Sequence, residues 1–510
     1  MSFLRASVVA ALAMSATLAS AQGTSASVEQ RLQQLEAEQA AMKQQLAERD
    51  AVIQELKREL AAQGAARAPV AATMPAAPPA AAGPAVPQQA AAAGQEPEAG
   101  GSPETRHPTP RPVETWGVYD PGDGFLVGRS EFGELSISSY AMARYMSQHD
   151  DDQVFTDHLG NERPVDIRSD IFSHRIMAFL KGWMGSEKLI YNITIWTVNT
   201  TDQDAIFANL GYQFSRQFSL YAGLAGNPGS RSLSGSHPYW LGHDRVMADE
   251  FFRPFFGSGI YATGEARPGL WYNVTVSNNN SALGVKASQL DRKLSYGGTV
   301  WWMPTTHEFG PRGGYGDWEW HEEVATRFGV SAFQSPEQSF RSTTGGNPDN
   351  TTLRLADSVN LFETGALAPG VTIENADYRV LALDAGLKYK GIFLQAEYYQ
   401  RWLDNFEADG FLPVGEIKDT GFYVQAAFFP VKQKLELYGI TSQIYGDDDA
   451  GFGDSSEYGV GMNWYPYPTR NHRLNVQLLD VNESPVSSTF GYYVGGQDGW
   501  TLASSFSVFF

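Results

Sequence analysis

Basic side chains recur in this sequence at positions where several of them could act together on anions. Between residues 227 and 256, cations and acids are interspersed as Arg231, His237, His243, Arg245, Asp249, Glu250 and Arg253. Six further cations fall within segments that alternate apolar and polar residues: Arg144, Arg175, Lys181, Arg327, Lys388 and Arg401. Guanidinium and ammonium groups hold carboxylates and phosphates through charge-assisted hydrogen bonds. Lined along one passage, these cations would draw anions through it.

The acids near these cations support a second interpretation. Arginines paired with Asp244, Asp249, Glu250, Asp384 and Glu397 would form a mixed-charge constriction instead of a cationic ladder. The formal net charge of −20 favours pairing, because such a charge repels anions at long range. It also excludes nucleic acid as a partner, since a surface that tracks phosphates needs clustered lysine and arginine. The sequence leaves both interpretations of the cations open.

Catalytic and metal-binding motifs are not found in the sequence. It contains no G-x-S-x-G, no H-E-x-x-H and no phosphate-binding P-loop. The run His321-Glu322-Glu323 lacks a second histidine, and we predict that it is solvated. Asp150 to Asp152 and Asp447 to Asp449 lack the spacing of a calcium-binding loop. We therefore predict no enzyme, no cofactor and no metal. A hydrolase whose residues meet only in the folded chain stays an alternative.

Strands must position the cations, because the hydrophobic pattern from Gly133 onward has a period of two. Hydrophobic residues make up 42% of the chain and charged residues only 18%, yet no later window has the run of about 18 apolar residues that a transmembrane helix requires. Only a closed barrel then satisfies the backbone polar groups inside a bilayer. We predict an all-β, 16-stranded antiparallel transmembrane β-barrel. The strands are expected near 133–147, 171–183, 188–198, 205–215, 217–226, 257–265, 270–278, 292–303, 320–334, 377–389, 391–403, 419–429, 434–445, 456–465, 472–481 and 498–510.

The connections between these strands are alternately short and long, as in barrels with tight periplasmic turns and longer loops on the other side. Long segments are expected at 148–170, 227–256, 335–376 and 482–497. The segment 304–319 is the exception, because it falls on the side of the short turns and is unusually long. A count of 18 strands therefore stays open.

The residues before the barrel have three different compositions. Residues 1–21 carry a basic start, an apolar run and a small-residue cleavage site, which indicate a signal peptide. Residues 26–62 show a heptad repeat that predicts an α-helical coiled coil. Residues 63–115 are rich in proline and alanine and predict an extended linker. The barrel domain is expected over 116–510, with the N-terminal extension in the periplasm.

Aromatic residues near the predicted strand ends are expected to form girdles at the two membrane interfaces. They are Tyr145, Trp183, Trp301, Trp302, Tyr389, Trp402, Phe428, Phe429, Trp464, Tyr465 and Trp500. The last strand places Phe506, Val508 and the terminal Phe510 on one face. It resembles the C-terminal strand of outer-membrane porins, which implies that these residues are a signal for the barrel-assembly machinery.

One long stretch resembles the phosphate-selective outer-membrane porins. It runs from His237-Pro238-Tyr239-Trp240 to Asp249-Glu250-Phe251-Phe252-Arg253-Pro254 and continues into GSGIYATG and WYNVTVSNN. The resemblance implies a long loop folded into the lumen as a constriction, with basic residues along an anion path. We expect a water-filled channel for passive diffusion of small hydrophilic solutes, including anions such as phosphate. It would lie among outer-membrane lipid and lipopolysaccharide as a homotrimer.

A carbohydrate-selective porin is the alternative channel. The coiled coil is similar to the periplasmic extension of certain sugar porins. Five aromatic residues fall on predicted lumen faces, where rings stack on sugars: Trp196, Tyr221, Trp271, Phe393 and Tyr399. Packing of these rings against the infolded loop is the competing interpretation, and we favour it because five scattered rings do not define one track.

Overall fold

The structure is a computed structural model, and it describes residues 124–149, 154–198, 203–234, 238–278, 280, 293–310, 314–339, 353–487 and 492–510. The predicted signal peptide, coiled coil and linker lie outside these residues, as do His237 and the Asp150 to Asp152 run. Among the helices of the described ranges, none has the length and apolarity needed to cross a membrane.

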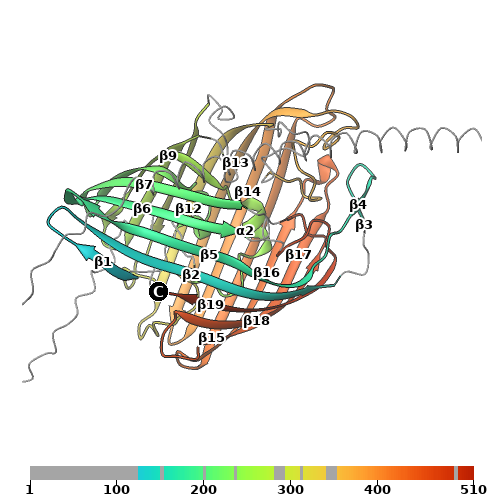
Figure 1. Ribbon diagram of the computed structural model, residues 1–510. Helices are drawn as coiled ribbons and strands as arrows, with labels where there is room; N and C mark the ends of the chain where they lie inside the picture. The colour runs from blue at the N-terminus through green and yellow to red at the C-terminus, as the bar shows by residue number, and fades with distance from the viewer. Residues whose placement is uncertain are drawn as a thin grey trace, which may run out of the picture. The chain divides into compact units, whose positions relative to one another are not determined.

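Sixteen strands of the described chain close into an antiparallel barrel (Figure 1). Each pairs with the next in order, and the last pairs back to the first, from Thr501 opposite Gln148 to Phe509 opposite Tyr140. The prediction of 16 strands is thereby confirmed over 18 for this part of the chain. The strands are β2 (Gly133–Gln148), β5 (Ser169–Met184), β6 (Ser186–Val198), β7 (Gln203–Ser215), β8 (Phe218–Gly226), β9 (Phe256–Arg267), β10 (Leu270–Ser277), β11 (Ser295–Trp302), β12 (Ala325–Gln338), β13 (Ile373–Tyr389), β14 (Ile392–Ala408), β15 (Glu416–Val431), β16 (Leu435–Tyr445), β17 (Asp454–Trp464), β18 (His472–Asn482) and β19 (Gly499–Phe509).

An additional strand, β1 (Phe125–Arg129), pairs with the first part of β2, from Phe125 opposite Ile137 to Arg129 opposite Glu134. The end of the chain lies directly beside it. Phe510 exchanges two backbone hydrogen bonds with Ser139, of 3.1 and 3.2 Å, and its ring lies 4.8 Å from that of Phe125. Strands β1 and β19 therefore occupy the same edge of β2, one after the other.

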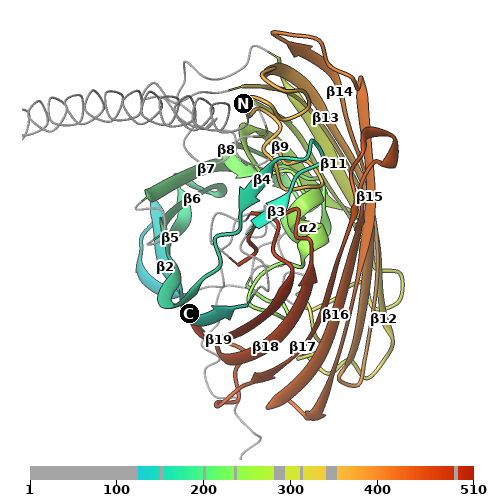
Figure 2. The same cartoon turned by 90° about the vertical axis from the view of Figure 1, so that its right-hand side faces the viewer.

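The remaining short elements belong to the connections. A separate hairpin of β3 (Val154–Thr156) and β4 (Glu162–Pro164) lies between β2 and β5. The connection from β8 to β9 contains the 3-10 helix η2 (Arg231–Ser234) and the helix α2 (Met247–Phe252), and η5 (Asp448–Ala450) lies between β16 and β17. Figure 2 shows α2 inside the ring of strands, and it contacts β14, β15 and β16.

The barrel is apolar outside, as a barrel in a bilayer must be, and its inside holds both polar and large apolar side chains. Along β14, Phe393, Gln395 and Glu397 are buried, while Ile392 and Leu394 alternate with them and are about half exposed. The burial pattern of β12 alternates in the same way. Because successive side chains of a strand point to opposite faces, the buried series faces the interior. Large buried side chains gather there around α2.

The girdle prediction is wrong for four aromatic residues, which point into the barrel: Trp183, Trp301, Phe429 and Tyr465. Trp302, Phe428 and Trp464 are exposed on the outer face, but their sequence neighbours must point the other way because faces alternate at every residue. Phe429 and Tyr465 are buried inside, and Trp301 lies under the buried Arg327. Trp183 is also buried, at 7% exposure, rather than facing lipid. Adjacent aromatic residues in a strand cannot both belong to an outer girdle.

Candidate functional site

The connection between β8 and β9 folds into the barrel and packs on the inner wall; we call its described residues, 227–234 and 238–255, the infolded loop. The first N–H groups of a helix have no partner within it. In α2 they are satisfied from the wall: Met247 N–H donates to Glu457 Oε2 at 2.8 Å and Ala248 N–H to Ser442 Oγ at 3.3 Å. At the other end of α2, the Tyr378 hydroxyl donates to the Phe252 carbonyl at 2.5 Å. Polar groups of β13, β16 and β17 thus fix the loop against the wall.

Two arginines of the infolded loop are paired with carboxylates of the same loop. Arg245 Nε lies 3.5 Å from Asp249 Oδ2, and Arg245 also lies 4.0 Å from Asp244. Arg253 donates two hydrogen bonds to Glu250, of 2.7 and 3.0 Å. Burial raises the pKa of Asp249, and the positive charges of Arg245 and Arg253 oppose that shift. These ion pairs balance much of the local charge.

Cations predicted on the strands also face inward and pair with acids. Arg175 reaches Asp244 at 2.7 Å, Arg327 reaches Asp384 at 3.0 Å, and Arg401 reaches Asp419 at 2.6 Å. The remaining wall cations are buried as well: Lys388 donates to the Phe309 carbonyl at 2.8 Å, Arg144 lies 4.6 Å from the Phe172 ring, and Lys181 is 7% exposed. The structure therefore forms pairs of the mixed-charge kind. That these residues line a solute path stays a prediction.

His243 contributes no positive charge to the loop near neutral pH. Its side chain is buried, and this burial, together with the nearby Arg144 and Arg473, lowers the pKa of His243 to about 3. The imidazole is therefore neutral at pH 7. Among the described residues of the infolded loop, the charged side chains are the arginines Arg231, Arg245 and Arg253 and the acids Asp244, Asp249 and Glu250.

Buried carboxylates on one arc of the wall were missed by the sequence analysis. Glu436 on β16 accepts from Asn463 at 2.8 Å, and Glu457 on β17 accepts from Ser442 at 2.8 Å and Tyr493 at 2.7 Å. With Glu397 and Asp419 they give β14 to β17 an acidic inner face, whereas β2, β5 and β18 present Arg144, Arg175, Lys181 and Arg473. The sequence signal for these glutamates is the alternation along β16 and β17, which places Glu436 and Glu457 on the inner face.

The long turn between β11 and β12 also enters the barrel; we call its described residues, 303–310 and 314–324, the strap. It bonds to three hairpin turns at the same end of the barrel. Asp317 accepts from Gly391 N–H at 2.7 Å, Gln433 donates to the Trp318 carbonyl at 3.2 Å, and Arg470 donates to the Tyr315 carbonyl. The strap is therefore long enough to reach the β13–β14, β15–β16 and β17–β18 turns.

The strap and the infolded loop meet inside the barrel. Tyr315 N–H donates to the Tyr239 carbonyl at 2.7 Å, and the Tyr315 hydroxyl lies 3.0 Å from that of Tyr423 on β15. The Arg231 guanidinium lies 4.0 Å from the centre of the Tyr315 ring. Two connections from opposite ends of the barrel thus share one contact region.

His321 is buried in the strap, so the predicted solvation of the run 321–323 is wrong for His321, whereas Glu322 and Glu323 are exposed. Burial alone would lower the pKa of His321. Hydrogen bonds to Asp317 and Glu308 outweigh this effect and raise the pKa to about 9. Asp317, Glu319 and His321 could offer ligand atoms to a metal within 4.8 Å of one another. Lys388 and Arg470 already lie 3.7 and 3.3 Å from Glu319, however. These cations balance the carboxylates, so the group gives no reason to infer a metal.

The five aromatic residues considered for sugar stacking each lie against another ring of the protein. Centroid distances are 5.1 Å from Tyr221 to Tyr261, 5.2 Å from Tyr399 to Phe252, 5.7 Å from Phe393 to Tyr315, 6.1 Å from Trp271 to Trp301 and 6.2 Å from Trp196 to Phe207. Phe252 belongs to the infolded loop and Tyr315 to the strap. These contacts are those expected from packing.

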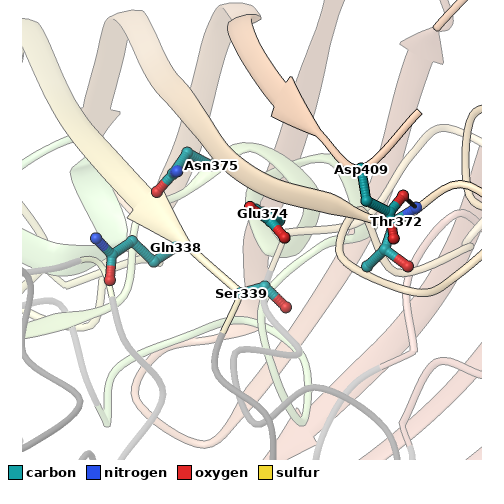
Figure 3. A pocket seen from close by; sticks show the side chains of 6 residues that line it. All are labelled: Gln338, Ser339, Thr372, Glu374, Asn375 and Asp409. Carbon is teal, nitrogen blue, oxygen red and sulfur yellow. Dashed lines mark hydrogen bonds between the residues drawn. The ribbon is translucent and has the colours of Figure 1, made fainter. Parts of the chain in front are cut away.

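A polar pocket of about 510 Å³ lies at the barrel end opposite the strap (Figure 3). It is lined by side chains from the ends of β12, β13 and β14 and their connections: Gln338, Ser339, Thr372, Glu374, Asn375 and Asp409. Asp409 accepts from Thr372 N–H at 2.7 Å. These lining residues include two acids and no cation, so the pocket does not suit an anion.

Comparison with known families gives one match. Residues 339–489 match the family model of the phosphate-selective porins O and P. This segment includes β13 to β18 and therefore Lys388, Arg401 and the acidic inner face. No curated protein matches the chain.

Solved structures that resemble the chain include several porins. An outer-membrane-expressed OmpT of Vibrio cholerae is 9% identical, with a TM-score of 0.47, and covers 76% of this chain and 100% of its own. An anion-selective porin from Comamonas acidovorans is 12% identical, with a TM-score of 0.42, and covers 74% of this chain and 99% of its own. OprB of Pseudomonas putida is 8% identical, with a TM-score of 0.42, and covers 74% of this chain and 94% of its own.

Proposed function

We propose that the chain is an outer-membrane porin of the phosphate-selective O/P-like family and that small hydrophilic solutes diffuse passively through it past a mixed-charge constriction. The family match over β13 to β18 carries this conclusion. A barrel of 16 strands is wide enough to enclose an aqueous channel. Nothing in the wall or the infolded loop favours a hydrolase, and we propose a channel without enzymatic activity.

Ion selectivity is proposed from the charge balance of the infolded loop. Its three arginines and three acids cancel, and His243 is neutral at pH 7. The ion preference then depends on more distant charges, and the net charge of the protein is strongly negative. Such a field attracts cations and is screened over roughly 10 Å at 0.1 M salt. We therefore propose a weak cation preference that declines as salt concentration rises, although the family carries the name phosphate-selective.

Planar-bilayer recording tests both parts of this proposal. Purified, folded protein is expected to give stepwise conductance, and its absence would defeat the channel. Reversal potentials in KCl gradients should show weak cation preference, stronger at low mean salt. Arg253→Gln and Glu250→Gln remove opposite members of one ion pair, so they should shift the preference toward cations and toward anions, respectively. A strong anion preference in the wild type, with block by millimolar phosphate, would instead favour phosphate transport.

Sugar transport is the second candidate, and the same recordings address it. The lumen-facing rings favour it only weakly, because each already has a ring partner in the protein. Block of the ion current by a neutral oligosaccharide, without block by phosphate, would make the carbohydrate-selective porin the better assignment.

A homotrimer with an accessory periplasmic module is proposed from the sequence pattern. The heptad repeat of residues 26–62 suits association between copies, and the proline-rich linker cannot transmit rigid packing to the barrel. Native mass measurement of the full chain should give three copies. Deleting residues 23–115 should leave a folded barrel that inserts into vesicles. Failure of the shortened chain to insert would make the extension part of the folding unit.

The end of the chain is proposed as the signal for the barrel-assembly machinery. Phe506 and Phe510 are 42% and 40% exposed, and Val508 lies on the same outer face. Lipid and lipopolysaccharide are the proposed surroundings of this face.

A further inference from the structure

We propose that Tyr315 is a positioning residue for the constriction, because its ring holds Arg231 of the infolded loop against β13 to β15. The inference rests on the proposed function, since positioning matters only if solutes pass the loop. It assigns a role to the long turn between β11 and β12, which the channel function alone does not require. The following contacts carry it.

Tyr315 makes three contacts in addition to the one with Arg231. Its N–H bonds to the Tyr239 carbonyl of the infolded loop, and its hydroxyl bonds to Tyr423 on the wall. Its ring meets Phe393 edge to face at 5.7 Å. Only 3% of its surface is exposed. A ring held this firmly presents a constant face to the guanidinium 4.0 Å away.

Arg231 needs that ring because its carboxylate partner is shared. Arg231 Nε lies 3.8 Å from Asp384 Oδ1, while Arg327 Nε lies only 3.0 Å from the same oxygen. Two buried cations thus face one carboxylate, and the closer one is Arg327. The negative faces of aromatic rings attract a cation, more strongly when it is desolvated. The strap supplies two such rings, Tyr315 and, at 5.8 Å, Phe309.

The backbone at Arg231 is held independently of its side chain. Its N–H donates to Glu397 Oε1 at 2.9 Å. Loss of the Tyr315 ring should therefore leave η2 in place and release the guanidinium. Without the ring, a buried guanidinium that shares the Asp384 carboxylate with Arg327 is energetically unfavourable. The Arg231 side chain should therefore turn toward water in the pathway. This would move the positive charge of Arg231 from its buried contacts into the pathway, where passing ions meet it.

The test compares reversal potentials in a KCl gradient for the full-length wild type and four full-length variants. Tyr315→Leu keeps most of the volume but removes the aromatic face, so it should shift the preference toward anions. Tyr315→Phe keeps the aromatic face but loses the side-chain hydrogen bond to Arg231, so its shift toward anions should be clearly smaller than that of Tyr315→Leu. Trp318→Leu is the matched control, because Trp318 also belongs to the strap but packs on Tyr465 and Phe429 at the rim. It should leave the preference unchanged. The double variant Tyr315→Leu with Arg231→Gln should lose the shift.

Three results would overturn the inference: no shift for Tyr315→Leu, an equal shift for Trp318→Leu, or a shift that survives in the double variant. A wild type without channel activity would defeat the proposed function instead, so the two failures are distinguishable. If Tyr315→Leu does not fold, fluorinated phenylalanines incorporated at position 315 keep the shape and weaken the negative ring face. The anion shift should then grow with each added fluorine, and its absence would also reject the role.

Discussion

Replacing Arg401 by alanine is expected to lower the free energy of unfolding by about 3–5 kcal/mol. Arg401 on β14 lies directly opposite Asp419 on β15 and donates two hydrogen bonds to it, of 2.6 and 2.9 Å. Both side chains are fully buried, and Phe251 of α2 packs 4.0 Å from the guanidinium. Alanine would leave the Asp419 carboxylate buried without its cation and remove a contact of the infolded loop.

Denaturant titration of the barrel refolded in vesicles measures this loss. The matched control is Arg129→Ala, which breaks the ion pair with Glu134 between β1 and β2. Arg129 is half exposed, and pairs of this kind contribute roughly 1 kcal/mol or less. The double variant Arg401→Met with Asp419→Asn should recover most of the stability, because no buried charge remains. Equal losses for Arg401→Ala and Arg129→Ala would contradict this account.

Replacing residues 304–324 by a short glycine-serine turn is expected to raise single-channel conductance several-fold. The strap crosses from β11 and β12 to the turn between β17 and β18 and reaches the infolded loop at Tyr239. Solutes that pass the loop must then also pass the strap. Its removal should widen the channel on the side of the short turns and free the side chains of Arg231 and Lys388, which contact Tyr315 and Phe309.

A second shortened chain separates this effect from that of any deletion. The connection of residues 409–415 between β14 and β15 lies at the opposite end of the barrel and is largely exposed, with Phe411 86% exposed. Shortening it should leave conductance unchanged. If the strap variant folds and still conducts like the wild type, the strap does not narrow the solute path.

The strands could be predicted from the sequence because a period of two is a local property. All 16 expected segments correspond to strands, and the boundaries differ by a few residues. The predicted strand 320–334 begins five residues too early, because β12 starts at Ala325 and residues 320–324 belong to the strap. The predicted strand 391–403 ends five residues too early, because β14 continues through Asp404 to Ala408. Polar residues beyond the bilayer keep the backbone pairing but lose the alternation that makes a strand visible in the sequence.

The interior could be predicted only in part, because it depends on contacts between distant segments. Alternation placed Lys388 and Arg401 on the inner face, but nothing local shows that Lys388 would bond to Phe309 or Arg401 to Asp419. The strap looked like a misplaced turn, since its partners Gly391, Gln433 and Arg470 are far from it in sequence. The coiled coil, the linker and the role of His237 lie outside the described residues and stay predictions.

The shared edge of β2 has a consequence for folding kinetics. Closure joins β2 to β19 across nearly the whole barrel domain, and pairings with such sequence separation form slowly. A slip of one residue would exchange the inner and outer faces of β19. The local hairpin of β1 and β2 can form early, and it occupies β2 up to Ile137, just beyond the Ser139 partner of Phe510. Strand β1 would then block pairing of β19 with β2 beyond Ser139, and it would thereby fix the register of the last strand when the barrel closes.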